Sequence, residues 1–292
     1  MFKRKSICII GGAGHVGVPL GLALSSKGFD VILIDKNKKN IKKINQGVMP
    51  FMEEGCEKLL KQMVYKKRIL ATNKLSDVEK CKYIIICIGT PINKKFRPDL
   101  KKFINFFYNL KKYLNQNHIL VVRSSIYPGV INKIFNIVKN RCKNLSYCPE
   151  RIAQGKSLIE LPKLPQIISG INEKAKKESA KIFKKICKKI IFKKIIEAEL
   201  TKLFSNAYRY INFSIANQFH LICQKEGLDF LKIRNLIKNN YERNANIPQA
   251  GFTAGPCLLK DTMQLSSFYN KKFSLFHAAK YVNESLPQSI IE

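Results

Sequence analysis

A glycine-rich segment near the N-terminus has the spacing that a dinucleotide phosphate requires. Gly12, Gly14 and Gly17 form a G-x-G-x-x-G pattern directly after an apolar run and before an apolar-faced helical stretch. The first glycine permits a tight turn, the second lets the backbone approach a pyrophosphate, and the third lets a helix pack closely on a strand. The N-terminus of the following helix offers N–H groups and a partial positive charge to the phosphates. These residues therefore predict a dinucleotide site.

Asp35 is the residue expected to select the ribose of that dinucleotide. It follows the second apolar run, close to the usual distance from the glycines. Its carboxylate can hold the ribose hydroxyls and repels a 2′-phosphate, which favours NAD. Lys36, Lys38 and Lys39 follow and could contact a phosphate, so NADP is the alternative. A glycine turn without a ligand, or another nucleotide in the same crevice, are the other interpretations.

A second set of side chains that could do chemistry lies in the C-terminal third. Cys257 stands between a Pro/Gly-rich loop at 248–256 and the pair Lys260-Asp261, a setting that suits a nucleophilic thiol. Lys202 and Asn206 are four residues apart and therefore share one helix face. The plainer alternatives are an inert buried thiol, one among nine cysteines, and a solvated surface pair.

The elements that must position these residues alternate between strands and helices. Short apolar runs predict strands at 6–10, 31–34, 83–88, 118–123, 145–148 and 166–169, with helices at 16–26 and 173–188. This alternation is typical of an α/β fold with a Rossmann-type doubly wound parallel sheet.

Helical spacing takes over after about residue 196. Glu197–Lys225 reads as one long spine helix that ends at Gly227, and further helices are expected at 229–238 and from about Lys260. We therefore expect an NAD-binding domain at 1–195, followed by an all-helical central and dimerisation domain at 196–292.

The composition excludes several classes of protein. The net charge of +33 is spread as lysine along nearly every segment. AT-rich coding explains it better than nucleic-acid binding, because no zinc-finger or RNP-type motif accompanies it. The scattered cysteines contain no CxxC pair, which argues against a disulfide framework or a zinc site. No apolar stretch approaches the roughly 20 residues of a membrane span. We expect a cytoplasmic protein with no metal, no membrane span and no nucleic-acid partner.

Several further motifs follow one another in a fixed order. They are Gly89-Thr90-Pro91, Ser124–Gly129, Cys148-Pro149-Glu150-Arg151-Ile152, Leu200–Arg209 and Gly255–Asp261. In this order and spacing, the sequence resembles the UDP-glucose/GDP-mannose dehydrogenase family over essentially its whole length. The segment around Glu150 looks most like the branch that acts on UDP-N-acetylmannosamine or UDP-N-acetylglucosamine. Each motif alone is modest, whereas the ordered set is highly specific.

The resemblance implies NAD-dependent oxidation of a UDP-sugar C6 alcohol to the uronic acid, in two hydride transfers. Cys257 matches the nucleophile that carries the thiohemiacetal and thioester. Lys202 and Asn206 match the pair that steadies the oxyanion. Asp261 and Ser125 match groups that share a catalytic water. The implied role of Glu150 is thioester hydrolysis.

The resemblance also implies contacts with cofactor and substrate. The expected cofactor contacts are Gly12, Gly14, His15, Val16, Gly17, Asp35, Thr90, Ser125 and Lys260. The expected substrate contacts are Glu150, Arg151, Lys202, Asn206, Phe252 and Gly255. The implied partners are the nucleotide sugar and a second copy of the chain, joined through the long helix. The implied setting is polysaccharide biosynthesis.

The sequence departs from the family pattern in three places. Ala254-Gly255 replaces the usual Gly-Gly, and Val130 replaces a common Thr. Family members continue into a third α/β domain that covers the nucleotide, whereas this chain ends at Glu292. We therefore expect the C-terminal nucleotide-sugar-binding domain to be absent, with activity impaired or completed by a partner.

Two other functions stay open on the sequence alone. A β-hydroxyacid or 6-phosphogluconate-type dehydrogenase has a similar length and an essential lysine, but it performs one hydride transfer and needs no cysteine. A non-catalytic remnant that binds NAD and dimerises through the long helix would account for the missing domain.

Overall fold

The computed structural model describes residues 6–90, 92–93, 99–253, 257–269 and 274–291. The chain forms two compact units. The first comprises residues 1–90 and 100–202, and the second comprises residues 91–99 and 203–292. Each unit is considered by itself.

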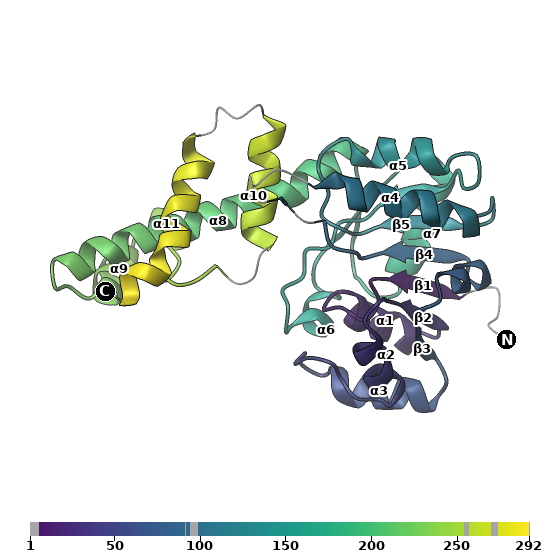
Figure 1. Cartoon of the computed structure of the whole chain (residues 1–292). Helices are drawn as coiled ribbons and strands as arrows, with labels where there is room; N and C mark the ends of the chain where they lie inside the picture. The colour runs from purple at the N-terminus through teal and green to yellow at the C-terminus, as the bar shows by residue number, and fades with distance from the viewer. Residues whose placement is uncertain (1–5, 91, 94–98, 254–256, 270–273, 292) are drawn as a thin grey trace. The chain divides into compact units, whose positions relative to one another are not determined.

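The first unit is built on one sheet of eight strands (Figure 1). The strands are β1 (Ile7–Ile10), β2 (Val31–Ile34), β3 (Ile69–Thr72), β4 (Tyr83–Ile86), β5 (Ile119–Val122), β6 (Leu145–Tyr147), β7 (Gln166–Gly170) and β8 (Ile190–Phe192). Their spatial order is β3-β2-β1-β4-β5-β6-β7-β8. β1 pairs in parallel with both β2 and β4, so the winding direction reverses between β1 and β4. In sheets of this type, ligands bind at the carboxyl ends of the strands beside that reversal.

Helices cover both faces of the sheet (Figure 1). They are α1 (Gly17–Ser26), α2 (Lys38–Asn45), α3 (Cys56–Tyr65), α4 (Leu100–Leu110), α5 (Val130–Val138), α6 (Ser157–Glu160) and α7 (Glu173–Phe183). Alternate residues of each central strand point to opposite faces. Ile7 and Ile9 of β1 therefore join the apolar cluster under α1, α3 and α7, while Cys8 and Ile10 join the cluster under α4 and α5. All the residues of β1, β2, β4 and β5 are buried, as expected for a sheet covered on both faces.

Helices make up most of the described residues of the second unit. Its elements are most of α8 (Ile195–Lys225), then α9 (Phe230–Lys238), α10 (Cys257–Phe268) and α11 (Ser274–Ile291). Tyr210 of α8, Leu258 of α10 and Ala279 of α11 form one small buried cluster. Further along α8, Ala216 and Cys223 pack with Phe230 of α9.

The predicted fold class is confirmed: a doubly wound sheet is followed by a helical unit with a long helix. One detail of that prediction was wrong, because β6 and β7 pair antiparallel while the other strand pairs are parallel. The helix expected at 173–188 ends at Phe183, and β3 and β8 were not predicted. None of the helices in the described part of the chain combines the length and the apolar character of a membrane span.

Candidate active site

The glycine-rich segment lies between β1 and α1, at the carboxyl end of the sheet. A Cβ on Gly12 would lie 2.5 Å from the Ile9 carbonyl oxygen and 2.8 Å from the Leu33 Cα. A Cβ on Gly17 would lie 2.5 Å from the Gly11 oxygen. A Cβ on Gly14 would meet only the Gly11 oxygen, at 3.5 Å. The first and third glycines are therefore needed for packing, while the second keeps open space in front of the backbone, as a pyrophosphate requires.

Asp35 follows β2 and is bonded to the same loop. Its Oδ2 accepts a hydrogen bond from the Ala13 N–H at 3.0 Å, and its Oδ1 accepts one from the Asn37 N–H at 3.0 Å. A carboxylate has about four acceptor sites, so lone pairs are left over for ribose hydroxyls. The predicted contacts His15 and Val16 lie in the same turn. The glycine cradle and this carboxylate fit an NAD molecule on geometric grounds.

Thr90 and Ser125 follow the next two strands and meet. The Thr90 hydroxyl donates a hydrogen bond to the Ser125 backbone carbonyl. The neighbouring Ser124 hydroxyl donates to the Ile88 carbonyl at 2.6 Å. The loops after β4 and β5 are thus joined beside the winding reversal, where a nicotinamide would be expected.

Glu150 and Arg151 follow β6, and both side chains are engaged within the protein. One oxygen of Glu150 accepts hydrogen bonds from the Arg123 guanidinium, and the other accepts the N–H groups of Arg151 and Ile152 at 2.8 and 3.1 Å. The Arg151 guanidinium donates to the Pro165 carbonyl. Sequence reasoning did not single out Arg123, because a basic residue at the end of a buried strand gives no signal by itself.

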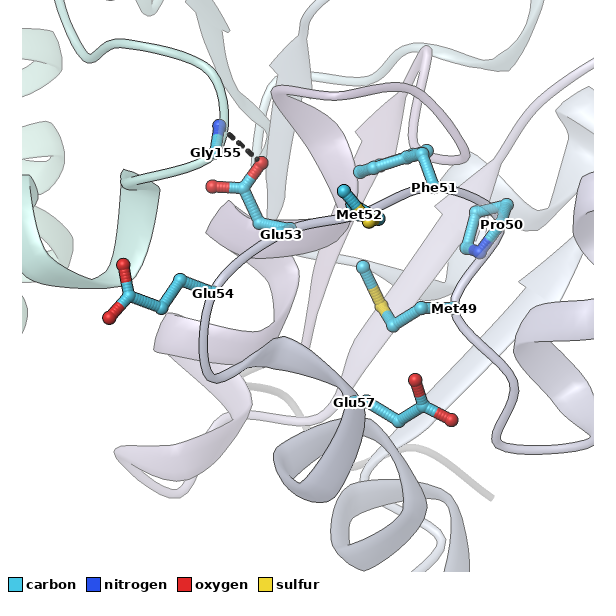
Figure 2. Close-up of a pocket in the computed structure, with 8 residues that line it drawn as sticks. All are labelled: Met49, Pro50, Phe51, Met52, Glu53, Glu54, Glu57 and Gly155. Carbon is cyan, nitrogen blue, oxygen red and sulfur yellow. Dashed lines mark hydrogen bonds between the residues drawn. The ribbon is translucent and has the colours of Figure 1, made fainter.

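A hollow of about 670 Å³ lies nearby, between the loop after α2 and the loop before α6 (Figure 2). Its lining residues are Met49, Pro50, Phe51, Met52, Glu53, Glu54, Glu57 and Gly155. The buried Glu53 carboxylate accepts the N–H groups of Gly155 at 2.9 Å and Ser157 at 2.7 Å. The centroids of the Phe51 and His15 rings lie 3.9 Å apart, and this contact connects the loop to the glycine-rich turn. Glu53 was also missed, since its partners are about a hundred residues away in the sequence.

Lys202 is half-buried on α8, three residues after a buried carboxylate. That carboxylate, Glu199, accepts the N–H groups of Gly129 at 2.8 Å and Ile131 at 3.2 Å, at the N-terminus of α5. Burial raises the pKa of Glu199 above its ordinary value, against the opposing effect of these two hydrogen bonds. The contact fixes the first turns of α8 to the loop after β5, which contains Ser125.

The second unit brings three predicted residues into contact. Asp261 is fully buried on α10. Its Oδ1 lies 2.7 Å from the Lys260 ammonium, and its Oδ2 accepts a hydrogen bond of 2.6 Å from the Asn206 amide of α8. Cys257 begins α10, one helical turn before Asp261, and it is the exposed thiol among nine free cysteines. An exposed thiol at a helix start, next to a cation and a buried carboxylate, is suited to nucleophilic chemistry.

The last two predicted substrate contacts precede α10 in the sequence. Phe252 is 62% exposed, and Gly255 lies outside the described residues. The loop is anchored at Gly251, whose N–H donates to the Asn217 side chain at 2.8 Å and whose carbonyl accepts from it at 3.2 Å. An exposed aromatic side chain on an anchored loop could contact a substrate.

Comparison with known proteins gives two family matches along the chain. The UDP-glucose/GDP-mannose dehydrogenase family, NAD binding domain, matches residues 5–191. The central domain of the same family matches residues 196–285.

Individual relatives agree with these matches. The UDP-N-acetyl-D-mannosamine dehydrogenase of Pyrococcus horikoshii is 28% identical over 94% of this chain, and that of Methanococcus vannielii is 30% identical over 98%. This chain spans about two thirds of their length, 68% and 66% respectively.

Solved structures show the same fold. The UDP-D-ManNAc dehydrogenase structure from Pyrococcus horikoshii has a TM-score of 0.88 at 27% identity. The match covers 97% of the present chain and 69% of the Pyrococcus chain. The UDP-glucose dehydrogenase structure from Pyrobaculum islandicum has a TM-score of 0.87 at 22% identity, and the match covers 98% of the present chain and 69% of the Pyrobaculum chain.

Proposed function

The chain belongs to the UDP-glucose/GDP-mannose dehydrogenase family, and we propose that it oxidises the C6 alcohol of a UDP-sugar to the uronic acid. Its first unit contains the NAD-binding domain of that family. We further propose the domains 1–195 and 196–292, and a homodimer formed through α8. UDP-N-acetylmannosamine is the proposed sugar nucleotide, because the relatives from Pyrococcus horikoshii and Methanococcus vannielii are named as dehydrogenases of that compound.

The observation that carries this proposal is the cluster around α10. Asp261 contacts both Asn206 and Lys260, and it lies one helical turn after the exposed thiol of Cys257. A dehydrogenase that performs a single hydride transfer needs no thiol. An acid-forming dehydrogenase can use one, because its aldehyde must gain a fourth substituent before a second hydride can leave, and a thiol can supply it.

The proposed chemistry runs in three stages. NAD, when bound, accepts one hydride in each of two oxidations. The alcohol loses a hydride and a proton to become the aldehyde, and the Cys257 sulfur adds to the carbonyl carbon to give a thiohemiacetal. Loss of the second hydride and of the hydroxyl proton leaves a thioester. Water then adds, the carbon–sulfur bond breaks, and the carboxylate and the thiol are released.

The residues of this chain are assigned roles in those stages. Lys202 and Asn206 steady the negative oxygen of the tetrahedral intermediates. Asp261 and Ser125 orient the water, and Glu150 acts in thioester hydrolysis. The proposed substrate contacts are Glu150, Arg151, Lys202, Asn206, Phe252 and Gly255. The glycine cradle, Asp35 and the joined loops of Thr90 and Ser125 hold the dinucleotide.

The test is the stoichiometry of the full chain with UDP-N-acetylmannosamine and NAD. The proposal expects two NADH per sugar, and it expects Cys257→Ser to produce no acid. Cys187→Ser is the matched control, because that thiol is half-buried in the first unit and donates to the Lys189 carbonyl at 3.6 Å. One NADH per molecule of a small hydroxyacid would support the single-transfer alternative. NAD binding without turnover of any nucleotide sugar would support a non-catalytic role.

A further inference from the structure

Arg123 is a buried cation directly after β5, with every part of its guanidinium engaged. Its side chain is 1% exposed. The Nε atom donates to Glu150 Oε2 at 3.1 Å, Nη2 donates to the same oxygen, and Nη1 donates to Gln166 Oε1 at 2.8 Å. The Phe183 ring lies under the guanidinium, with 4.8 Å between the ring centroid and Cζ. The charge is therefore held in one place by two acceptors and an aromatic face.

Glu150 is the carboxylate that balances this charge. Burial alone would raise the pKa of Glu150, but the Arg123 charge, its hydrogen bonds and the two backbone N–H groups hold that pKa below its ordinary value. The thiols of Cys87 and Cys148 also lie near Arg123, yet burial raises the pKa of each to about 12, so both are neutral near pH 7. Glu150 is therefore the ionised partner of Arg123 near pH 7.

The same carboxylate begins a chain of contacts that fixes the loop after β6. Glu150 holds the N–H groups of Arg151 and Ile152. Glu160 Oε2 then accepts the Ala153 N–H at 2.7 Å. Glu53 accepts the N–H of Gly155 (Figure 2) and that of Ser157. Of these three carboxylates, Glu150 pairs with the Arg123 guanidinium inside the core.

We propose that Arg123 is a positioning residue, which keeps Glu150 ionised and fixes the turn at 150–152 against the end of β5. Glu150 then serves the acid-forming step by holding the turn in place, and it does not carry a proton. A protonated Glu150 would leave the Arg123 guanidinium buried without a countercharge, which is strongly unfavourable. The inference rests on the proposed function, since the turn is the one expected to contact the sugar.

The test is a double-mutant comparison in the full chain, with Arg123→Gln, Glu150→Gln and the double variant. Glu150→Gln leaves a buried guanidinium unbalanced and should lower kcat by about 100-fold, the usual order for a displaced catalytic group. The double variant contains two amides and no buried charge, and the new amide oxygen at position 150 can still accept the two backbone N–H groups. Its kcat should exceed that of Glu150→Gln by about tenfold or more.

Two results would overturn the inference. If Glu150 itself transfers a proton, the double variant will be no faster than Glu150→Gln. If the pair is merely structural, Arg123→Gln will lower the melting temperature while kcat per folded molecule stays at the wild-type value. In Arg123→Gln, kcat per folded molecule should instead fall while the KM for NAD stays the same.

A milder variant decides the matter if the glutamine variants do not fold. Arg123→Lys keeps the charge but loses the planar fork that reaches both Glu150 and Gln166. It should lower kcat and leave the KM for NAD unchanged, and a wild-type kcat would overturn the inference. A wild-type chain that oxidises no UDP-sugar is a different outcome, because that result contradicts the proposed function itself.

Discussion

Asn206→Ala offers the sharpest single perturbation of the cluster in the second unit. The amide of Asn206 donates a 2.6 Å hydrogen bond to the fully buried Asp261 carboxylate. Losing a hydrogen bond to a buried charged group costs about 1–3 kcal/mol of stability. If Asn206 also faces the oxyanion, removing it costs about 2.7–4 kcal/mol in the transition state, or about 100- to 1,000-fold in kcat.

The assay separates these two losses. The free energy of unfolding is measured by urea denaturation, and kcat is measured as NADH formation from UDP-N-acetylmannosamine, divided by the fraction of folded protein. Asn283→Ala is the matched control, because Asn283 is also a buried asparagine of the second unit, bonded to the Tyr210 carbonyl and to Asn217. It should lose similar stability and keep its kcat. Equal kcat values in the two variants would refute the role of Asn206 at the oxyanion.

Four further predictions concern the first unit. Gly12→Ala should lower stability by about 1–3 kcal/mol, because its Cβ would meet backbone atoms at 2.5 and 2.8 Å. Gly14→Ala should instead keep stability and lose NAD affinity in calorimetric titration, and unchanged affinity would contradict the cradle. Asp35→Ala should raise the preference for NADP over NAD in kcat/KM by about tenfold, through loss of a charged hydrogen-bond acceptor and of its repulsion; a constant ratio would contradict the ribose role. Hydrogen bonds from Lys181, Lys82 and Tyr83 hold the pKa of Glu178 at about 2, against a burial effect that raises it. The folded pKa lies below the ordinary value of 4.5, so its stabilisation is present above about pH 5 and is lost as the pH falls toward 2. Urea unfolding at neutral and acid pH measures this loss. Between the two pH values, the free energy of unfolding should fall by about 2 kcal/mol more in wild type than in Glu178→Gln, allowing for solvent screening of exposed lysines. Equal losses in the two proteins would contradict the assignment.

The parts of the fold that depend on local pattern could be predicted from the sequence. The buried strands β1, β2, β4 and β5 are continuous apolar runs, and the glycine spacing between β1 and α1 has one common structural meaning. Strand direction is not encoded in such a run, so the antiparallel pairing of β6 with β7 was missed. β8 was missed because it has three residues between lysine pairs and is only partly buried.

The candidate site divides in the same way. Asp35 could be predicted, because it lies at a fixed distance from the glycines. The contact between Asn206 and Asp261 joins residues 55 positions apart and was not predicted, because the family resemblance implied a separate role for each residue. Arg123 and Glu150 lie 27 positions apart, and nothing in either segment shows that they pair. Such long-range pairs of buried charges require the folded structure before they can be seen.

The most direct test of the central claim is peptide mass spectrometry of the full chain, quenched during turnover of NAD and UDP-N-acetylmannosamine. The peptide containing Cys257 should gain the mass of the sugar nucleotide as an acyl group. This adduct should also decay as the acid forms. Formation of the acid with no adduct on Cys257, or with the adduct on another cysteine, would contradict the account.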